Sequence, residues 1–402
     1  MPYRELNFDS QNLTGAFSEV KEMFRMHFER GCRYVTQRVY EKILAVDFDR
    51  FLNASRHERT CQRRGYRNGY RSRRLLTSVG ALDLQVPRDR DGQYRPDLFA
   101  RYQRVDHSLE ESIRAMFLGG VSTRKVGDIL DVLCGERLSA SKVSTVVKEL
   151  DQAVRDFANS PLTDDFVFLF LDALSVRVKC GLKAKKVKLL VAYGIRADGS
   201  RCLLSFQRAR SESYACWKAF VENLHVRGLK GRSLKLIVMD GAVPLWAAVE
   251  EVYPFVEHQL CWVHKLRNVA KYCPVRHRQD CVRQAAQIMY APSGTLAAKR
   301  FRAWKQRWQD QIPKAVACLE RDFDKLIPMF EFPQAIQRMI RTTNVIERCF
   351  REVRRRLKVM GYFQNSKSCD RIIYAIFNYF NTKWTRNAEK IKAIKNVTDE
   401  AA

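Results

Sequence analysis

The stretch that decides the fold is TTNVIER, residues 342–348, which continues as CFREVRRRLK through residue 358. Its apolar residues recur at helical spacing and predict one amphipathic helix: Ile346, Phe350, Val353 and Leu357. Glu347 lies beside this apolar stripe, so its carboxylate can point along the edge of a core. Arg351, Arg354 and Arg355 follow on the neighbouring face. A carboxylate at the start of an arginine-rich helix suggests a metal site with a phosphate backbone lying against it.

A second interpretation of the same helix is purely structural. Asn344 with Glu347 three residues later fits a capping box, in which the glutamate side chain only accepts a hydrogen bond from a backbone N–H. The helix alone does not separate the two interpretations. Evidence that favours the metal site comes from upstream.

Charge and composition indicate the kind of partner. The 402 residues include 72 Lys and Arg against 44 Asp and Glu, a net charge of +28, and this excess favours a polyanion such as nucleic acid. No apolar run approaches the length of a membrane-spanning helix, and the N-terminal residues do not resemble a signal peptide. The twelve cysteines form no Cys-x-x-Cys pair, which is typical of reduced thiols in an intracellular protein.

Two aspartates follow apolar runs that predict buried strands. Residues 166–171 (FVFLFL) end at Asp172, and residues 234–239 (LKLIVM) end at Asp240. Between them, residues 187–195 and 202–206 predict two more strands and residues 214–224 a helix. Three antiparallel strands, a helix, a strand and a helix is the order of a ribonuclease-H-like sheet, in which Asp172 and Asp240 would meet. Either aspartate alone could be a helix cap or turn residue.

Two N-terminal segments are candidates for nucleic-acid contact. Residues 56–95 interleave arginine with glycine and tyrosine, a composition that suits phosphate contact, although a solvated charged face is the alternative. Residues 108–150 carry a helix-turn-helix pattern with helices at 109–118, 122–133 and 142–150. The last helix has short polar and basic residues that suit a major groove. The predicted DNA-binding residues of the two segments are Arg63, Arg64, Arg67, Arg71, Arg124, Lys142, Ser144 and Lys148.

These patterns predict a multidomain chain of mixed α/β class. A helical element (1–55), a basic segment with short strands (56–100) and the helix-turn-helix unit (101–155) precede the catalytic domain. That domain comprises residues 160–265 and 335–385, interrupted by a helical insertion at 266–334, and a polar tail follows at 386–402.

Several motifs in this order resemble one family. Asp172 in FLDALSV, Asp240 in VMDGA, the segment CWVHKLRNV (261–269) and TTNVIER are similar to motifs of bacterial insertion-sequence transposases related to the plant Mutator elements. The resemblance extends from about residue 56 to 383. It implies a ribonuclease-H-like fold, a helical insertion before the last acidic residue, and an Asp-Asp-Glu triad that falls on Asp172, Asp240 and Glu347.

The chemistry that the resemblance implies explains why three carboxylates are needed. Two Mg²⁺ (or Mn²⁺) ions about 3.5–4 Å apart neutralise a scissile phosphate and activate the attacking oxygen, and such hard cations take oxygen ligands. Asp172 would bridge both ions, with Asp240 on one and Glu347 on the other. Arg348, Arg351 and Arg355 on the same helix could hold the DNA backbone, or could simply be solvated.

Cys261 and His264 form half of a zinc-ligand pattern, which Cys273 and His277 could complete. The apolar residues around them favour packing beside the active site instead. Zinc binding stays open as the alternative.

The sequence therefore predicts a DNA transposase that binds the inverted-repeat ends of its element, cuts there, and joins a 3′-hydroxyl to target DNA. We expect a cytoplasmic, nucleoid-associated bacterial protein that acts as a homodimer or larger assembly on DNA, without a membrane partner. A ribonuclease-H-like nuclease without joining activity and a transposase-derived DNA-binding regulator are the alternatives.

Overall fold

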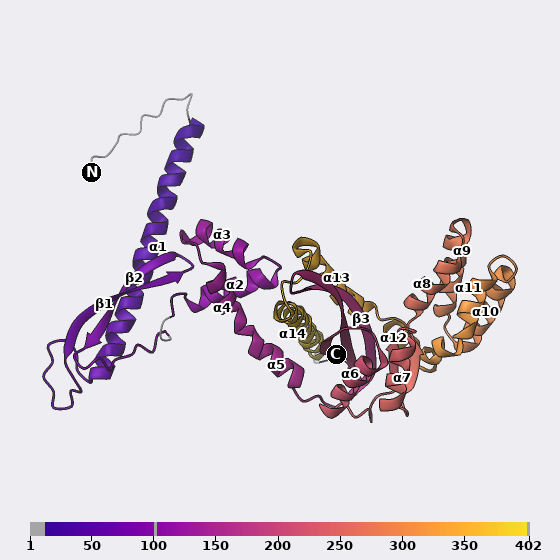
Figure 1. Cartoon of the computed structure of the whole chain (residues 1–402). Coiled ribbons are helices and arrows are strands. Elements are labelled where there is room, and N and C mark those ends of the chain that lie inside the picture. The colour runs from indigo at the N-terminus through magenta and orange to yellow at the C-terminus, as the bar shows by residue number, and fades with distance from the viewer. Residues whose placement is uncertain (1–12, 100–102, 400–402) are drawn as a thin grey trace. The chain divides into compact units, whose positions relative to one another are not determined.

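The computed structural model describes residues 13–99 and 103–399, with side chains described for residues 21–99 and 103–385. The chain divides into two compact units, one ending at Lys148 and the other beginning at Glu149 (Figure 1). Among the described residues, no helix combines the length and the apolarity that spanning a membrane requires.

The first unit joins a long helix, a β-hairpin and three short helices. Its elements are α1 (Leu13–Leu52), β1 (Arg67–Thr77), β2 (Gly80–Asp89), α2 (His107–Leu118), α3 (Thr123–Cys134) and α4 (Ala140–Lys148). The strands β1 and β2 pair antiparallel, and the hairpin lies against α1 (Figure 1). Both strands lie in the basic segment 56–100, for which short strands were expected, and the arginine-rich run 67–77 forms one of them.

The C-terminal end of α1 packs into a core. Leu44 is buried with Leu75, Leu82, Leu84 and Val86 of the hairpin. Phe48 and Leu52 are buried against Tyr94. Further towards the N-terminus the apolar residues of α1 are exposed, among them Phe24, Phe28, Val35 and Val39. The predicted helical element is therefore, from Leu13 on, a single helix, and its large apolar side chains between residues 23 and 39 are exposed in the described part of the chain.

The three short helices begin and end close to the predicted positions. Ser122 caps α3 by accepting a hydrogen bond from the backbone N–H of Lys125, and Gly135 ends it in the left-handed conformation with φ 67°. Ser139 precedes α4 and accepts a hydrogen bond from the backbone N–H of Lys142 at 3.2 Å. Val143, Val146 and Val147 face the core of the unit. Of the predicted contact residues on α4, Lys148 is exposed, whereas Lys142 and Ser144 are half-buried.

The second unit is built on a five-stranded mixed sheet. Its strands are β3 (Phe166–Cys180), β4 (Lys183–Arg196), β5 (Arg201–Ala209), β6 (Leu236–Met239) and β7 (Glu257–Leu260). Their order is β5-β4-β3-β6-β7, with β3, β4 and β5 antiparallel and β6 and β7 parallel to β3. The central position of β3 explains its almost uninterrupted apolar run, because both faces of it are covered.

Helices cover the sheet on both faces. On one face α6 (Tyr214–Val226) and α7 (Val243–Val252) bury Trp217, Phe220 and Val249 against Leu169 and Leu171 of β3. On the other face lie α13 (Asn344–Met360) and α14 (Ser366–Asp399), both in contact with β3. The helix α5 (Leu150–Asn159) packs against α14 and β5.

The predicted helical insertion lies between β7 and α13. It contains α8 (Trp262–Tyr272), α9 (Val275–Met289), α10 (Gly294–Trp308), α11 (Pro313–Arg321), the 3₁₀ turns η1 (Asp324–Leu326) and η2 (Pro328–Glu331), and α12 (Gln334–Ile340). Its first four helices pack on one another beside the sheet (Figure 1). The segment 386–402, predicted as a tail, continues α14 as far as Asp399, and residues 400–402 lie outside the described part.

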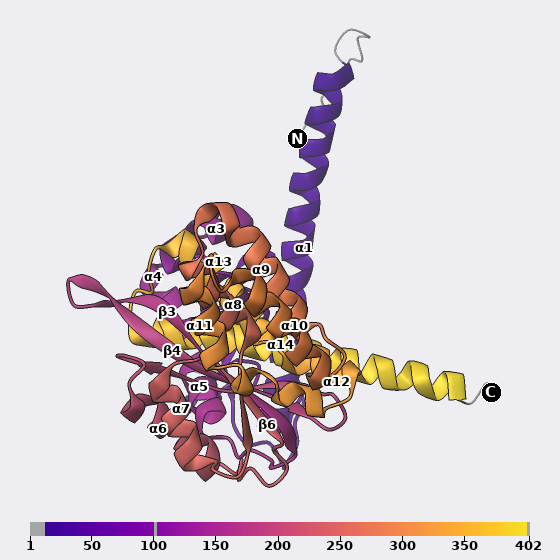
Figure 2. The same cartoon turned by 90° about the vertical axis from the view of Figure 1, so that its right-hand side faces the viewer.

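Two features of the sheet differ from the prediction. The strand β3 does not end at Asp172 but runs eight residues further, because it continues as a hairpin with β4 that projects from the sheet (Figure 2). The strand β7 was not predicted, because its sequence EHQL lacks the alternation or apolar run that marks a strand.

Candidate functional site

The first two predicted acids lie side by side on neighbouring strands. Leu171 of β3 is paired with Met239 of β6, and Asp172 and Asp240 are the next residue on each. Asp240 follows the end of β6 and accepts a hydrogen bond from the N–H of Ala242 at 3.1 Å. The expected juxtaposition of the two positions is therefore present, although only β6 ends there.

Asp172 is buried in a way that leaves part of its carboxylate unsatisfied. Its side chain is 4% exposed, Oδ1 accepts from the N–H of Ala173 at 2.7 Å, and Oδ2 has no hydrogen-bond partner in the described part of the chain. Burial raises the pKa of Asp172 to about 6, although the nearby His264 opposes this, and the charge of Asp240 raises it further. Burial also raises the pKa of Asp240. Two such carboxylates favour a cation between them.

The burial of Asp172 predicts a stability that depends on pH. Because the pKa of Asp172 is higher in the folded than in the unfolded chain, protonated Asp172 favours the folded state. Its contribution to stability is fully present below the unfolded pKa near 4 and is lost as pH rises through about 6. In EDTA at pH 8, Asp172→Asn should therefore be more stable than the wild type by about 2–3 kcal/mol. The gain should vanish near pH 4, as measured by thermal unfolding. The exposed Asp310→Asn is the control, and an equal gain there or a gain at all pH values would contradict the assignment.

Glu347 comes to this region from α13, in which the predicted apolar stripe is confirmed by the burial of Ile346, Phe350 and Val353. Both of its carboxylate oxygens accept from Arg267 of α8, Oε1 from Nη1 at 2.6 Å and Oε2 from Nη2 at 3.0 Å. This pairing holds the pKa of Glu347 below its usual value. The capping-box interpretation is wrong, because α13 begins at Asn344 without a side-chain cap and Glu347 points at α8.

Cys261 joins the strand that precedes Asp240 to the helix that carries Glu347. It lies buried between β7 and α8, and its N–H donates to the carbonyl of Met239 at 2.7 Å. Its sulfur accepts from the N–H of Thr343 at 3.4 Å and lies 3.5 Å from the hydroxyl of the same residue. Cys261 therefore helps to fix the beginning of α13 relative to the end of β6.

The surroundings of His264 favour its protonated form. Burial lowers its pKa, but the Cys261 thiol and the carboxylates of Asp172 and Asp240 outweigh burial and raise it to about 9. Nε2 of His264 is 3.9 Å from Oε1 of Glu347. His264 and Arg267 are three residues apart on α8, so both can face Glu347.

The donor set fits a divalent cation only in part. The unsatisfied oxygen of Asp172 and its neighbour Asp240 fit a hard cation. Glu347 is paired with Arg267 and does not complete a three-ligand site with these two aspartates. In the described ranges, no group of three His, Cys, Asp or Glu side chains is arranged to hold a metal ion. Of the other suggested zinc ligands, Cys273 donates to the carbonyl of Val269 and His277 lies against the ring of Trp308.

The packing of Cys261 yields a direct test of the zinc alternative. Cys261→Ser should lower the free energy of unfolding by about 1–3 kcal/mol, because a hydroxyl replaces a packed sulfur. The purified wild type should contain no stoichiometric zinc, and EDTA should leave its melting temperature unchanged. Cys180→Ser, at an exposed thiol, is the control. One equivalent of zinc per chain that disappears in Cys261→Ser would favour the zinc site.

The first unit contains a basic cleft of about 1150 Å³. Its described lining includes seven cationic side chains and one carboxylate, namely Arg71, Arg73, Arg74, Arg95, Arg104, Arg137, Lys142 and Glu136. Arg74 pairs with Glu136 at 3.1 Å, and Arg73 lies over the ring of Phe99. In the described ranges, Arg71, Arg104 and Lys142 have no carboxylate within 4 Å. These three cations are available to an anionic ligand.

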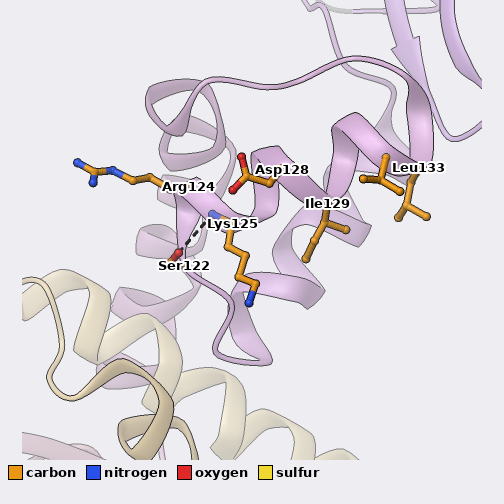
Figure 3. A pocket seen from close by; sticks show the side chains of 7 residues that line it. Ser122, Arg124, Lys125, Asp128, Ile129 and Leu133 are labelled. Carbon is orange, nitrogen blue, oxygen red and sulfur yellow. Dashed lines mark hydrogen bonds between the residues drawn. The ribbon is translucent and has the colours of Figure 1, made fainter.

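The other predicted contact residues of the first unit do not line this cleft. Arg67 donates to Asp49 and to the carbonyl of Ala54 and lies over Phe48, so it ties the hairpin to α1. Arg63 binds nearby carbonyls, and Arg64 is exposed. Ser144 is half-buried and Lys148 exposed on α4. Arg124 lies on the outer side of α3, beside a shallow apolar pocket that Ile129 and Leu133 help to line (Figure 3).

Cations also gather on the second unit. Arg348, Arg351 and Arg355 are all exposed on α13. The projecting hairpin, which was not predicted from the sequence, exposes Arg177, Lys179, Lys183, Lys185 and Lys186. Its register places Arg177 directly opposite Lys186, an arrangement that is unfavourable unless an anion lies nearby. Arg267 was missed as well, although it lies inside the 261–269 motif, three residues after His264.

Comparison with known proteins connects this arrangement to one family. The sequence profile of the transposases of the Mutator family matches residues 10–387. The transposase for insertion sequence element ISRM5 of Rhizobium meliloti is 36% identical over 88% of each chain. That for element IS256 in transposon Tn4001 of Staphylococcus aureus is 32% identical over 88% of this chain and 90% of the relative. The solved Drosophila P element transposase strand transfer complex aligns with 75% of this chain and covers 82% of its own, at 13% identity and a TM-score of 0.32.

Proposed function

The chain belongs to the Mutator family of transposases, and from that premise we propose that it cuts DNA at the inverted-repeat ends of its element and joins the 3′-hydroxyls to target DNA. The observation that carries this proposal is the pairing of Leu171 with Met239, which puts Asp172 and Asp240 next to each other. The contacts of Cys261 with Met239 and Thr343 then bring the helix of Glu347 to the same place.

The reaction has two steps with the same chemistry. In cleavage, a water oxygen bonds to phosphorus and the bond to the 3′-oxygen breaks, which leaves a 3′-hydroxyl. In joining, that hydroxyl bonds to a phosphorus of the target and displaces its 3′-oxygen. In each step the attacking oxygen loses a proton and the leaving oxygen gains one. Divalent cations, Mg²⁺ or Mn²⁺, would neutralise the phosphate and activate the nucleophile.

The residues of this chain have separate parts in that proposal. Asp172, Asp240 and Glu347 would hold the cations through their carboxylate oxygens. Arg348, Arg351 and Arg355 would bind the DNA backbone along α13, since the exposed face of that helix presents guanidinium groups that match phosphate oxygens. Cys261 and His264 would act through packing and charge beside the acids.

The finer features of the fold form part of the same proposal. The strand order β5-β4-β3-β6-β7 and the helices on both faces support a ribonuclease-H-like catalytic domain, 160–265 with 335–385, interrupted by the insertion 266–334. The caps and bounds of α2, α3 and α4 support a helix-turn-helix unit at 101–155. We propose that this unit and the basic segment 56–100 recognise the element ends.

The basic cleft suggests how the two recognition segments cooperate. Arg71 comes from β1, Arg104 from the connection to α2, and Lys142 from the first turn of α4. Because these three cations line one cleft, a single stretch of phosphate backbone could contact the hairpin and the helix-turn-helix unit together. We place the protein on DNA as a homodimer or larger assembly, in the bacterial cytoplasm at the nucleoid.

A strand-transfer assay tests the proposed function. The substrate is a duplex that carries the element's own terminal repeat, and the target is a supercoiled plasmid in Mg²⁺. Transposase activity predicts cleavage at the repeat and covalent joining of its 3′-end to the plasmid. Cleavage without joining would instead indicate a nuclease, and binding without cleavage a DNA-binding regulator.

A further inference from the structure

The contact between Arg267 and Glu347 occupies a carboxylate that the proposed reaction needs. Both oxygens of Glu347 accept from the same guanidinium, at 2.6 Å and 3.0 Å. Such a two-pronged, charge-assisted pair fixes the orientation of the carboxylate as well as its charge. Glu347 therefore faces α8, and in the described ranges it forms no cation site with Asp172 and Asp240.

The backbone around this pair is already tied in place. The side-chain N–H of Gln259 donates to the carbonyl of Ile340 at 2.9 Å, and the N–H of Trp262 donates to that of Arg341 at 3.2 Å. Cys261 adds its contacts with Met239 and Thr343. Because these bonds fix the starts of α8 and α13 relative to β6, a change in the direction of the Glu347 carboxylate would have to come from its side chain and not from a movement of the helix.

The guanidinium of Arg267 is open to an exchange of partner. Its side chain is 53% exposed, whereas that of Glu347 is 21% exposed, so a ligand can approach the arginine first. A phosphate presents the same pair of oxygen acceptors to a guanidinium as a carboxylate does. Partly exposed ion pairs are weak, so a high local density of DNA phosphate can compete with Glu347 for Arg267.

We propose that Arg267 is a positioning residue: its ion pair holds Glu347 away from the cation site until a DNA phosphate binds the guanidinium in place of Glu347. Glu347 then turns towards Asp172 and Asp240 and completes the set of oxygen ligands. This inference rests on the proposed function, because it takes the competing anion to be the DNA backbone. It makes the completion of the cation site depend on DNA.

Mn²⁺ binding to the DNA-free, full-length protein tests the first half of the proposal. Titration calorimetry should give about tenfold tighter Mn²⁺ binding for Arg267→Gln than for the wild type, a change that one charge-assisted pair can support. The matched control is Arg354→Gln, since Arg354 acts on Glu347 by charge without a hydrogen bond between them. That control should change the affinity less than about twofold.

Further variants assign the gain to Glu347. The double variant Arg267→Gln/Glu347→Gln should lose the tighter binding, because the released ligand is absent. Arg267→Met, which keeps the apolar stem and removes the charge, should reproduce the result of Arg267→Gln. Affinities of Arg267→Gln and Arg267→Met that equal those of the wild type or of Arg354→Gln would overturn the proposal.

A second titration, with a saturating DNA duplex, tests the release. The difference in Mn²⁺ affinity between the wild type and Arg267→Gln should fall below about twofold, because phosphate has already displaced Glu347 in the wild type. A difference that stays near tenfold would contradict release by DNA. If the wild type cleaves and joins DNA but Arg267→Gln binds Mn²⁺ no more tightly than the wild type, only this inference is overturned. If the wild type neither cleaves nor joins DNA in Mg²⁺, the proposed function is overturned.

Discussion

Glu347→Gln is expected to reduce DNA cleavage and joining about a thousandfold or more while leaving DNA binding intact. The amide keeps the volume of the side chain but removes an anionic oxygen ligand, and a barrier higher by about 4 kcal/mol corresponds to this loss of rate. Asp172→Asn and Asp240→Asn should have the same effect. Single-turnover assays with the element-end duplex measure the rates, and gel shifts measure binding.

The same helix provides the control for this prediction. Glu352 lies five residues further along α13 and pairs with Arg356 at 2.9 Å and with Arg355 at 3.4 Å. Glu352→Gln removes an acid of the same type from the same helix and should keep most of the activity. Appreciable Mg²⁺-dependent transfer by Glu347→Gln, or loss of activity only in Glu352→Gln, would show that the wrong glutamate has been assigned.

Removal of residues 1–148 is expected to abolish specific recognition of the element ends. The chain divides at this position into two compact units, and the basic cleft lies wholly in the first. Affinity for the terminal repeat should drop about a thousandfold or more, to the level of non-specific DNA, because specific binding typically exceeds non-specific binding by at least that factor. Weak, salt-dependent binding should remain through the exposed cations of α13 and of the projecting hairpin.

Footprinting and salt titration measure this loss. End-specific protection by residues 149–402 alone would place recognition outside the first unit. In the full chain, changing Arg71, Arg104 and Lys142 to alanine together should reduce the slope of log affinity against log salt by about 2 to 3, one phosphate contact for each cation. A triple change of Arg64, Arg124 and Lys148, exposed residues that do not line the cleft, is the matched comparison.

The local sequence was sufficient to predict the structure where a residue's environment depends on its own strand or helix. The apolar runs before Asp172 and Asp240 predicted buried strands, and the stripe around Ile346 predicted the burial seen in α13. The helix expected at 122–133 agrees with α3 for the same reason, since its caps, Ser122 and Gly135, act within one turn.

The local sequence was insufficient to predict the structure where a residue's conformation or partner is determined by a contact with a distant part of the chain. Arg267 and Glu347 are 80 residues apart, so nothing near Glu347 distinguishes a capping residue from the partner of a distant guanidinium. The segment β7 is a strand because β6 pairs with it, although three of its four residues are polar. The length of β3 beyond Asp172 likewise depends on its pairing with β4.

The hydrogen bonds between residues 259–262 and 340–343 also bear on how the chain can vary over evolutionary time. They join the two ends of the helical insertion at its base, next to the acids. The entropy of closing a loop grows only with the logarithm of its length, about 0.6 kcal/mol for each doubling. Helices could therefore be gained or lost between these ends at little thermodynamic cost, while the geometry that presents Glu347 is inherited unchanged.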